Sequence, residues 1–242
     1  MRIALVLVAL AACGGGDDYE KTTGGGPGGG MTTGGADART DAVSDGALGD
    51  GPMLAGRVCL VTDLRVLDGC ATTGAGGLAV TLGTATATTA DDGTFAIAAQ
   101  SGTGLVWHAS GGTIATSVMP VTAVQVIPAI DATAYGQLVV GQTGAAFVPG
   151  RGSLVARVIG SDGTAVAGAS AVDTPPGIDA VLYDGASATS WQELSTGAQG
   201  VVWIPHAADG ANTLAVTPAT GDPASVTATV EDVSITFVTV AL

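Results

Sequence analysis

From Met53 to the C-terminus, apolar residues alternate with small or polar residues in short runs, and Gly, Asp and Pro interrupt those runs. Alternation turns every second side chain toward a core, so each run predicts a half-buried β-strand. Asp91-Asp92-Gly93 predicts a turn that joins two of these strands as a hairpin. The first group of expected strands covers Gly56–Thr62, Leu78–Leu82, Ala85–Thr89, Thr94–Ala98, Gly104–Ser110 and Thr113–Val121.

The stretch Pro128–Val140 predicts a short helix that leads to a second group of strands. Many short strands separated by turn signals are typical of an all-β protein. The second group of expected strands covers Ser153–Ile159, Ala167–Asp173, Ala180–Tyr183, Gly200–Ile204, Asn212–Thr217, Ser225–Glu231 and Val233–Ala241.

The two groups share an order of short motifs, which indicates an internal repeat. We therefore expect two tandem antiparallel β-sandwiches, domain 1 at residues 53–148 and domain 2 at residues 149–242, each of ordinary size for that architecture. The corresponding segments are Gly56-Arg-Val-Cys-Leu-Val and Gly152-Ser-Leu-Val-Ala-Arg-Val, Gly77-Leu-Ala-Val and Gly168-Ala-Ser-Ala-Val, and Thr89-Ala-Asp-Asp-Gly-Thr-Phe-Ala-Ile and Thr196-Gly-Ala-Gln-Gly-Val-Val-Trp-Ile.

The motifs of the first unit also carry a family resemblance. They are Gly56-Arg-Val, Gly77-Leu-Ala-Val-Thr-Leu, Thr89-Ala-Asp-Asp-Gly-Thr-Phe-Ala-Ile and Trp107-His-Ala-Ser-Gly. In this order they resemble the carboxypeptidase regulatory-like, or transthyretin-like, β-sandwich. The second unit departs from the pattern, because Gln199-Gly200 replaces the Asp-Gly turn and Asp173–Gln192 is a longer excursion. The resemblance implies an accessory module of enzymes, transporters or surface lipoproteins that has no catalysis of its own.

The N-terminus predicts export. Arg2 is followed by an apolar run and small residues up to Ala12, a pattern typical of a secretory signal peptide and too short to span a bilayer. Leu10-Ala11-Ala12-Cys13 resembles the lipobox of bacterial lipoproteins, which implies a signal peptide at residues 1–12 and a lipid on Cys13. An ordinary cleaved signal peptide with an incidental cysteine is the alternative. Residues 13–52, rich in Gly, Asp and Thr, predict a disordered tether.

The charge pattern bears on partners. The net charge is -14, and Lys21 and six scattered arginines are the only basic residues. Phosphate binding needs clustered Lys and Arg, so the sequence argues against nucleic acid. The same charge disfavours attachment to anionic lipid through the surface, so we expect the lipid on Cys13 to provide the membrane contact. The acidic excess is typical of a solubilising surface.

Two further cysteines, Cys59 and Cys70, lie close in sequence. Outside the reducing cytosol a disulfide between them is the expected state, and it would close the short loop from Leu60 to Gly69. A metal site with two thiolate ligands is the alternative. No histidine lies nearby in sequence, and two ligands do not make a zinc site.

The sequence offers few groups for catalysis. His108 and His206 are the only histidines, neither lies near a Gly-x-Ser-x-Gly motif, and neither is followed by Glu at zinc-carboxypeptidase spacing. Because His108 takes the strand face opposite Trp107, we expect it at the surface or rim of a sandwich. We expect His206, which follows Pro205, in a loop after a strand. No catalytic residue, cofactor or metal site is therefore predicted.

Aspartates at two turns raise the question of calcium. Asp91-Asp92-Gly93 and Asp162-Gly163 supply suitable oxygens, but a calcium loop needs several spaced ligands that close on one point. Asp-Gly between two strands is more often a turn with positive φ. We expect turns here.

The tryptophans supply the one candidate binding region. Trp107 and Trp203 lie among Val and Ile, so core packing is expected for both. Trp191 instead ends the long excursion, and loops on a sandwich are where recognition is concentrated. A tryptophan that caps its own core is the alternative. The candidate ligand-binding residues are Asp179, Tyr183, Asp184, Trp191 and Glu193.

Together these features predict a non-enzymatic lipoprotein of a bacterial envelope, at the outer membrane or cell surface, that displays β-sandwich modules for protein assembly. The competing hypothesis is a module that recognises cell-wall or capsular glycan through the Trp191 region. An enzyme of unfamiliar type ranks behind both, because no acid, base and nucleophile converge in the sequence.

Overall fold

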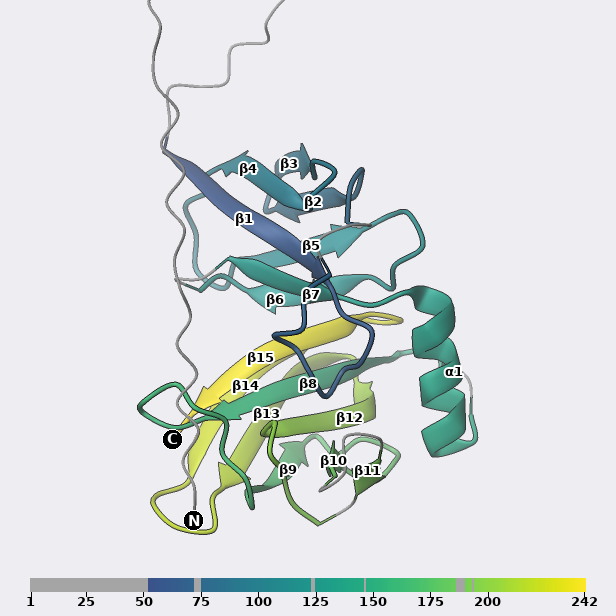
Figure 1. Cartoon of the computed structure of the whole chain (residues 1–242), viewed down its shortest axis with the longest axis vertical. Helices are drawn as coiled ribbons and strands as arrows, with labels where there is room; N and C mark the ends of the chain where they lie inside the picture. Colours follow the sequence, from purple (N-terminus) through teal and green to yellow (C-terminus); the bar gives the residue numbers. More distant parts are fainter. Residues whose placement is uncertain (1–51, 72–74, 123–124, 146, 186–189, 193) are drawn as a thin grey trace, which may run out of the picture. The chain divides into compact units, whose positions relative to one another are not determined.

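A computed structural model describes residues 52–71, 75–122, 125–145, 147–185, 190–192 and 194–242. These residues belong to one compact unit, Ala47–Leu242. The predicted signal peptide, Cys13 and most of the predicted tether lie outside the described residues, and so does Glu193. Apart from one helix, the regular secondary structure of the described part is β-strand, which confirms the predicted all-β sandwich class (Figure 1).

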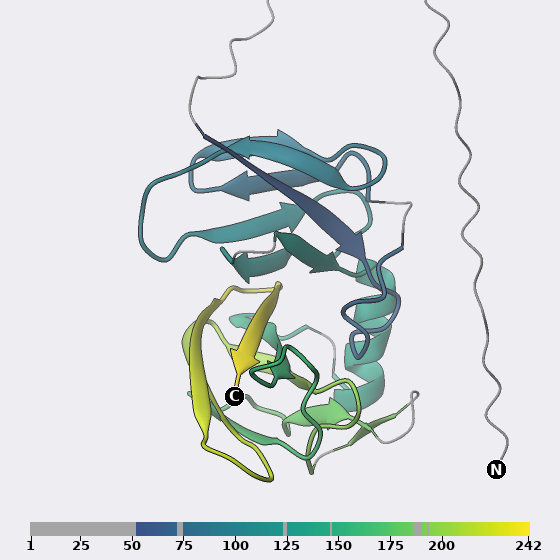
Figure 2. The ribbon, with the colours of Figure 1, turned by 60° about the vertical axis from the view of Figure 1, so that its left-hand side comes forward.

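The first strand set occupies the blue-to-teal part of the chain (Figures 1 and 2). Its elements are β1 (Met53–Leu60), β2 (Ala79–Leu82), β3 (Ala85–Thr88), β4 (Thr94–Ala98), β5 (Val106–Ser110), β6 (Ser117–Pro120) and β7 (Val126–Ala129). The helix α1 (Ala132–Thr143) follows. The expected helix therefore starts later than predicted, because Val126–Ala129 extends along β1 as a parallel strand.

The second strand set is green to yellow. Its elements are β8 (Arg151–Ile159), β9 (Ser170–Thr174), β10 (Leu182–Asp184), β11 (Trp191–Gln192), β12 (Val201–Ala208), β13 (Gly210–Thr217), β14 (Ala224–Val230) and β15 (Ile235–Ala241). The sequence pattern predicted neither β7 nor the two-residue β11.

Three sheets contain these strands. One has the order β4-β1-β7, one the order β14-β13-β9, and the third runs through both strand sets in the order β11-β10-β12-β8-β15-β6-β5-β2-β3. The sheets are mixed rather than wholly antiparallel, because β1–β7, β8–β15 and β15–β6 pair in parallel. The β15–β6 pairing joins the two strand sets into one continuous sheet. The division into domains at residues 148 and 149 remains a prediction.

The internal repeat is visible in the hydrogen bonds of two threonines. The Thr89 hydroxyl accepts from the N–H of Leu78, and the Thr196 hydroxyl accepts from the N–H of Ala169, both at 2.9 Å. Each hydroxyl also donates to a carbonyl three residues before its N–H donor, that of Ala75 for Thr89 and that of Val166 for Thr196. The two motifs paired in the sequence therefore occupy equivalent places in the two strand sets.

Two glycines make the second equivalent contact. The carbonyl of Gly93 accepts from the N–H of Val58 at 2.9 Å, and the carbonyl of Gly200 accepts from that of Val158 at 2.7 Å. Both glycines have positive φ, and a Cβ on either would lie only 2.4 Å from the Val58 oxygen or 2.6 Å from the Val158 oxygen. Glycine is thus required at both turns by the close approach of a backbone.

The first motif of the repeat has a different register from the expected one. Gly56 and Ala156, not Gly56 and Gly152, occupy the same position against β4 and β12. Gly152 serves another contact, since a Cβ there would lie 2.2 Å from the carbonyl oxygen of Glu231. The expected match of Gly152 with Gly56 is therefore wrong, because Gly152 is required by its close approach to Glu231.

The turn at Asp92 and Gly93 forms as expected, but the hairpin prediction is wrong. The Asp92 carboxylate accepts from the N–H and hydroxyl of Thr94, which closes the turn. However, β3 pairs with β2 and β4 pairs with β1, so the turn carries the chain from one sheet to another. Alternation in two adjacent strands cannot distinguish these topologies, because both bury one face of each strand.

The core connects the two strand sets. A first cluster of buried side chains includes Trp107 and Phe95 of the first set and Trp203, Val155 and Phe237 of the second. A second cluster lies within the second set, between β14-β13-β9 and one face of β8 and β12. The sheet that contains β8 is therefore covered on both faces, which explains the near-continuous burial of β8.

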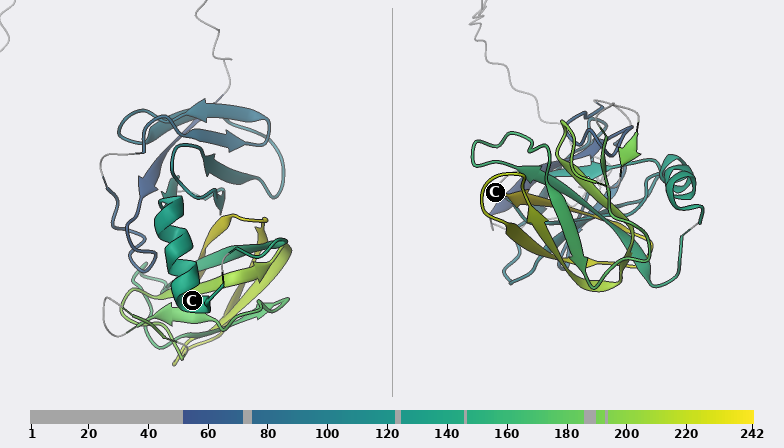
Figure 3. Two further views of the ribbon diagram at one scale, coloured as in Figure 1. Left: turned by 90° about the vertical axis from the view of Figure 1, so that its right-hand side faces the viewer. Right: turned by 90° about the horizontal axis from the view of Figure 1, so that it is seen from below.

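Helix α1 lies alongside both strand sets (Figure 3). Asp131 caps its N-terminus by accepting from the N–H groups of Thr133 and Ala134, and Gly144 ends it with φ of 73°. Its buried residues, Tyr135 and Val139, belong to the first core cluster.

A buried polar network anchors the helix. The Tyr135 hydroxyl donates to Ser153 Oγ, which also accepts from Trp203 Nε1 at 3.3 Å and donates to the Pro205 carbonyl. Burial raises the pKa of Tyr135, so the phenol stays neutral and able to donate. One hydroxyl thus satisfies three partners, as buried polar groups require.

Candidate functional site

The loop that follows β1 brings the two strand sets together. A disulfide joins Cys59 to Cys70, which confirms the predicted pairing, and we call residues 61–69 between them the junction loop. Leu64 of this loop is fully buried in the first core cluster. The Asp63 carboxylate accepts from Arg65 Nε at 2.8 Å and Nη2 at 2.7 Å. Burial raises the pKa of Asp63, but these bonds and the charge of Arg65 hold it below its usual value.

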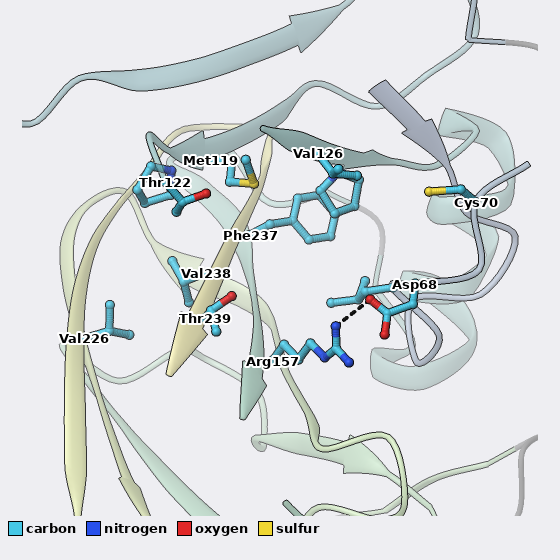
Figure 4. Close-up of a pocket in the computed structure, with 13 residues that line it drawn as sticks. Asp68, Cys70, Met119, Thr122, Val126, Arg157, Val226, Phe237, Val238 and Thr239 are labelled. Atoms are coloured by element: carbon cyan, nitrogen blue, oxygen red, sulfur yellow. Dashed lines mark hydrogen bonds and ion pairs between the residues drawn. The ribbon is translucent and has the colours of Figure 1, made fainter. Parts of the chain in front are cut away.

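An apolar groove of about 800 Å³ opens beside the junction loop (Figure 4). It lies between the two strand sets, because residues of β6, β7, β14, β15 and the junction loop all line it. Its charged pair, Arg157 and Asp68, forms an ion pair across the two sets. The apolar lining consists of Leu67, Met119, Pro120, Val126, Pro128, Val226, Phe237 and Val238.

One side of the groove is an incompletely paired strand edge. β15 pairs with β8 along its whole length, from Ile235 to Ala241, but it pairs with β6 only at Ile235 and Thr236. Beyond that point no described strand pairs with β15 on the side away from β8. Thr239, which lines the groove, lies in this part of the strand.

The backbone direction along β15 follows from two hydrogen bonds. The N–H of Leu242 donates to the carbonyl of Ile159, the last residue of β8, at 2.9 Å. On the opposite side of β15, the N–H of Ile235 donates to the carbonyl of Thr116 at 2.8 Å. In a parallel ladder successive residues bond to alternate sides. Thr239 therefore directs its N–H and C=O away from β8, and Ala241 continues the same edge. These groups can hydrogen-bond an added extended chain.

The predicted ligand-binding residues do not form one open site. Asp184 is buried, and its carboxylate accepts from the N–H groups of Gly197, Gln199 and Val201 at 2.7 to 2.9 Å. These bonds shape the turn before β12. The carboxylate thus closes a turn, a contribution that the sequence interpretation missed.

Two other members of that set also have internal partners. Tyr183 is buried, and its hydroxyl bonds the N–H and carbonyl of Ala171. Asp179 is bound to His206 on β12. The prediction that these side chains bind a ligand therefore remains a prediction, and their observed contacts are within the fold.

Trp191 is half-buried rather than presented on a loop. Its ring lies 4.9 Å from that of Trp203, and the guanidinium of Arg65 lies 6.0 Å from its centroid. A small hollow of about 390 Å³ adjoins it, bordered by α1 and the junction loop. Arg65 lines this hollow, and its Nη1 is buried without a hydrogen-bond partner among the described residues. Trp191 mainly packs against the core and the junction loop.

The two histidines have different environments. His108 is partly exposed and bonds Glu231 at 2.7 Å, which confirms its expected place at a rim. The loop prediction for His206 is wrong, because it lies within β12 and is 2% exposed. A register shift between Ile204 and Ala207 lets the strand continue past Pro205. The prediction assumed that β12 ends before Pro205, but the strand continues because the bulge accommodates the proline.

The aspartates at the turns bind backbone and hydroxyl groups. Asp162 accepts from the N–H and hydroxyl of Thr164, as Asp92 does from Thr94. The hydrogen bonds of these hydroxyls hold the pKa of both carboxyls below the usual value. Within the described ranges, no group of three or more potential metal ligands is found. In the same ranges no helix is long and apolar enough to cross a membrane.

Comparison with known proteins was made by sequence and by structure. No protein-family model matches the chain, and no curated protein matches it. The transthyretin-like resemblance of the first unit therefore remains a prediction.

Several solved structures are similar over part of the chain. They include the TIE protein of Bacillus anthracis (11% identity, 68% of this chain and 24% of that one, TM-score 0.27) and a streptococcal ancillary pilin (10%, 78% and 68%, TM-score 0.26). A third is the shaft pilin SpaA of Lactobacillus rhamnosus GG (10%, 78% and 97%, TM-score 0.25). The chain spans about a quarter of the length of the Bacillus anthracis protein. Likenesses at these TM-scores carry no argument about function.

Proposed function

We propose that this chain is a non-enzymatic module that takes part in protein assembly on the outside of a bacterial cell, and that its apolar groove receives an extended segment of a protein partner. The observation that carries the proposal is the edge of β15 at Thr239 and Ala241, which no described strand pairs and which adjoins the groove at Thr239. An added strand would satisfy these backbone groups and place alternate side chains on the apolar lining.

The apolar lining of the groove supports this use. Val226, Val238 and Phe237 provide apolar surface from the second strand set, and Met119 and Val126 provide it from the first. A partner strand would thus contact both sets at once. Such a strand gains affinity from main-chain bonds and specificity from the pockets that receive its side chains.

The sequence pattern supports the location. The predicted signal peptide, the predicted lipid on Cys13 and the Gly-rich tether would hold the folded part away from a membrane. The disulfide between Cys59 and Cys70 fits an oxidising compartment. We therefore place the module at the outer membrane or the cell surface, with protein rather than nucleic acid as its partner.

A matched pair of variants tests the proposal. Thr239→Pro removes the N–H that faces away from β8, whereas Thr239→Val retains it and removes only the hydroxyl. Affinity capture from intact cells should recover the same partner with the wild type and Thr239→Val, and at least tenfold less with Thr239→Pro. Equal recovery with all three would contradict strand addition at β15. Purified cell-wall glycan recovered in place of protein would favour the competing glycan hypothesis.

A further inference from the structure

The junction loop contacts the second strand set at several places. Asp68 pairs with Arg157 of β8, which lies 89 residues further along the chain. Arg65 lies over the ring of Trp191 on β11. Leu64, which precedes Arg65, is fully buried in the core cluster that both strand sets share. The loop is therefore a strap across the junction of the two sets.

The disulfide holds both ends of this strap. Cys59 is buried near the end of β1, and Cys70 follows the last residue of the loop. Two hydrogen bonds also hold that end among the described residues: the N–H of Ala71 donates to the Leu60 carbonyl at 2.9 Å, and Arg57 Nη2 donates to the Ala71 carbonyl at 3.2 Å. Closure of the loop thus depends on one covalent bond and these hydrogen bonds.

The two sulfurs differ in access. Cys59 is fully buried, whereas Cys70 is partly exposed and lines the apolar groove (Figure 4). A thiolate that enters the groove reaches Cys70 first. Thiol–disulfide exchange proceeds by attack on an accessible sulfur, with the other sulfur as leaving group.

We propose that the Cys59–Cys70 disulfide is a redox latch that couples the two strand sets, and that a dithiol reductant releases it through the groove. A thiolate of the dithiol attacks Cys70 Sγ, the S–S bond breaks, and Cys59 leaves as a thiolate that takes up a proton. The second thiol of the reductant then displaces Cys70 from the mixed disulfide. Two electrons pass to the cystine, giving two protein thiols and one oxidised dithiol.

Release of the latch should loosen the junction and leave the second sandwich folded. Cross-linking a loop of this length restricts the open state by about 100-fold in population. Without the cross-link, opening of the junction loop should therefore become about 100-fold more frequent. Its contacts to Arg157 and Trp191 would be lost in each opening, whereas β13 and β14 are held by their own continuous pairing from Gly210–Val230 to Val216–Ala224.

Hydrogen exchange on the full chain tests the latch. All samples carry Cys13→Ala, so that Cys59 and Cys70 are the only cysteines present. The oxidised protein is compared with the same sample after dithiothreitol, with both thiols alkylated and counted by mass. Exchange at the amides of Val66 and Gly69, which bond Asp63 and Val66 carbonyls, should rise about 100-fold. Exchange at Trp191–Gln192 should rise with it, and residues 210–230 should not change.

Two results would overturn the proposal. Exchange that rises only between residues 59 and 71 would show that the cystine does not couple the strand sets. A rise that includes residues 210–230 would show that it supports the whole fold. Arg157→Gln in the oxidised protein is the matched control, because it removes the ion pair with the latch closed and should change exchange at Val66 less than tenfold. No partner is needed, so the outcome is independent of the proposed function.

Discussion

Asp173 on β9 gives the most specific stability prediction. Asp173 is 5% exposed, and among the described residues neither of its carboxylate oxygens accepts a hydrogen bond of normal geometry. Burial raises its pKa from 3.8 to about 6, against an opposing effect of the Thr174 N–H. The folded protein therefore holds the proton more tightly than the unfolded chain does.

The contribution of Asp173 to the free energy of unfolding decreases as the pH rises. The stabilisation from the raised pKa is complete below pH 3.8 and is lost as the pH rises through about 6. A difference of about two pKa units, at about 1.4 kcal/mol each, gives about 3 kcal/mol lost between pH 4 and pH 7.5. Asp173→Asn removes the charge and keeps the shape, so it should remove this loss.

Urea unfolding followed by tryptophan fluorescence measures the effect. Asp173→Asn should be more stable than the wild type at pH 7.5, by up to about 3 kcal/mol, and the difference should shrink toward pH 4. Asp222→Asn, at an exposed turn, is the control and should change little at either pH. A difference that stays constant with pH, or that grows toward acid, would refute the reasoning.

Three other predictions concern packing and recognition. Ser153→Ala removes the hydroxyl shared by three buried groups and should cost about 1–3 kcal/mol in urea unfolding; a loss below about 0.5 kcal/mol would exclude the network as a stabilising element. Gly93→Ala and Gly200→Ala should each lower the melting temperature more than Gly163→Ala does. All three glycines have positive φ, but only at Gly93 and Gly200 would a Cβ lie within 3 Å of a carbonyl oxygen. Equal decreases in melting temperature would argue against this close approach. Trp191→Ala should lower the melting temperature and leave any affinity for cell-wall polysaccharide unchanged, whereas a selective loss of affinity in titration would revive the glycan hypothesis.

Local patterns predicted the strands whose two faces differ. β4 matches its expected range, Thr94–Ala98, because Phe95 and Ile97 face the core and the residues between them face solvent. β12 was predicted to end at Ile204, yet it continues to Ala208 through a bulge. Alternation is a weak guide there, because both faces of β12 are buried and a proline interrupts the pattern.

The repeat was predictable in outline, whereas the joining of its copies was not. The Thr-to-Gly motif identified equivalent turns, since the same hydroxyl and carbonyl contacts recur in both copies. The continuous sheet depends on Ile235 of β15 lying beside Ser117 of β6. Residues so far apart in sequence share no local pattern, so nothing along the chain indicates that pairing.

The groove was missed for the same reason. Its lining comes from six separate segments, and its unpaired edge exists only because β15 and β6 pair at two positions and then separate. The sequence drew attention to Trp191 as a rare aromatic residue near polar neighbours. In the structure those neighbours bond to the fold itself, as Asp184 does to three backbone N–H groups.

Site-specific photocrosslinking from the groove tests the central claim most directly. A photoreactive residue in place of Val226, which lines the groove, is compared in intact cells with one in place of Thr213 on the exposed face of β13. The account predicts that position 226 crosslinks to one extended segment of one protein, that position 213 does not, and that Thr239→Pro abolishes the crosslink. Absence of a protein crosslink at position 226, or the same products from both positions, would contradict an assembly function for this groove.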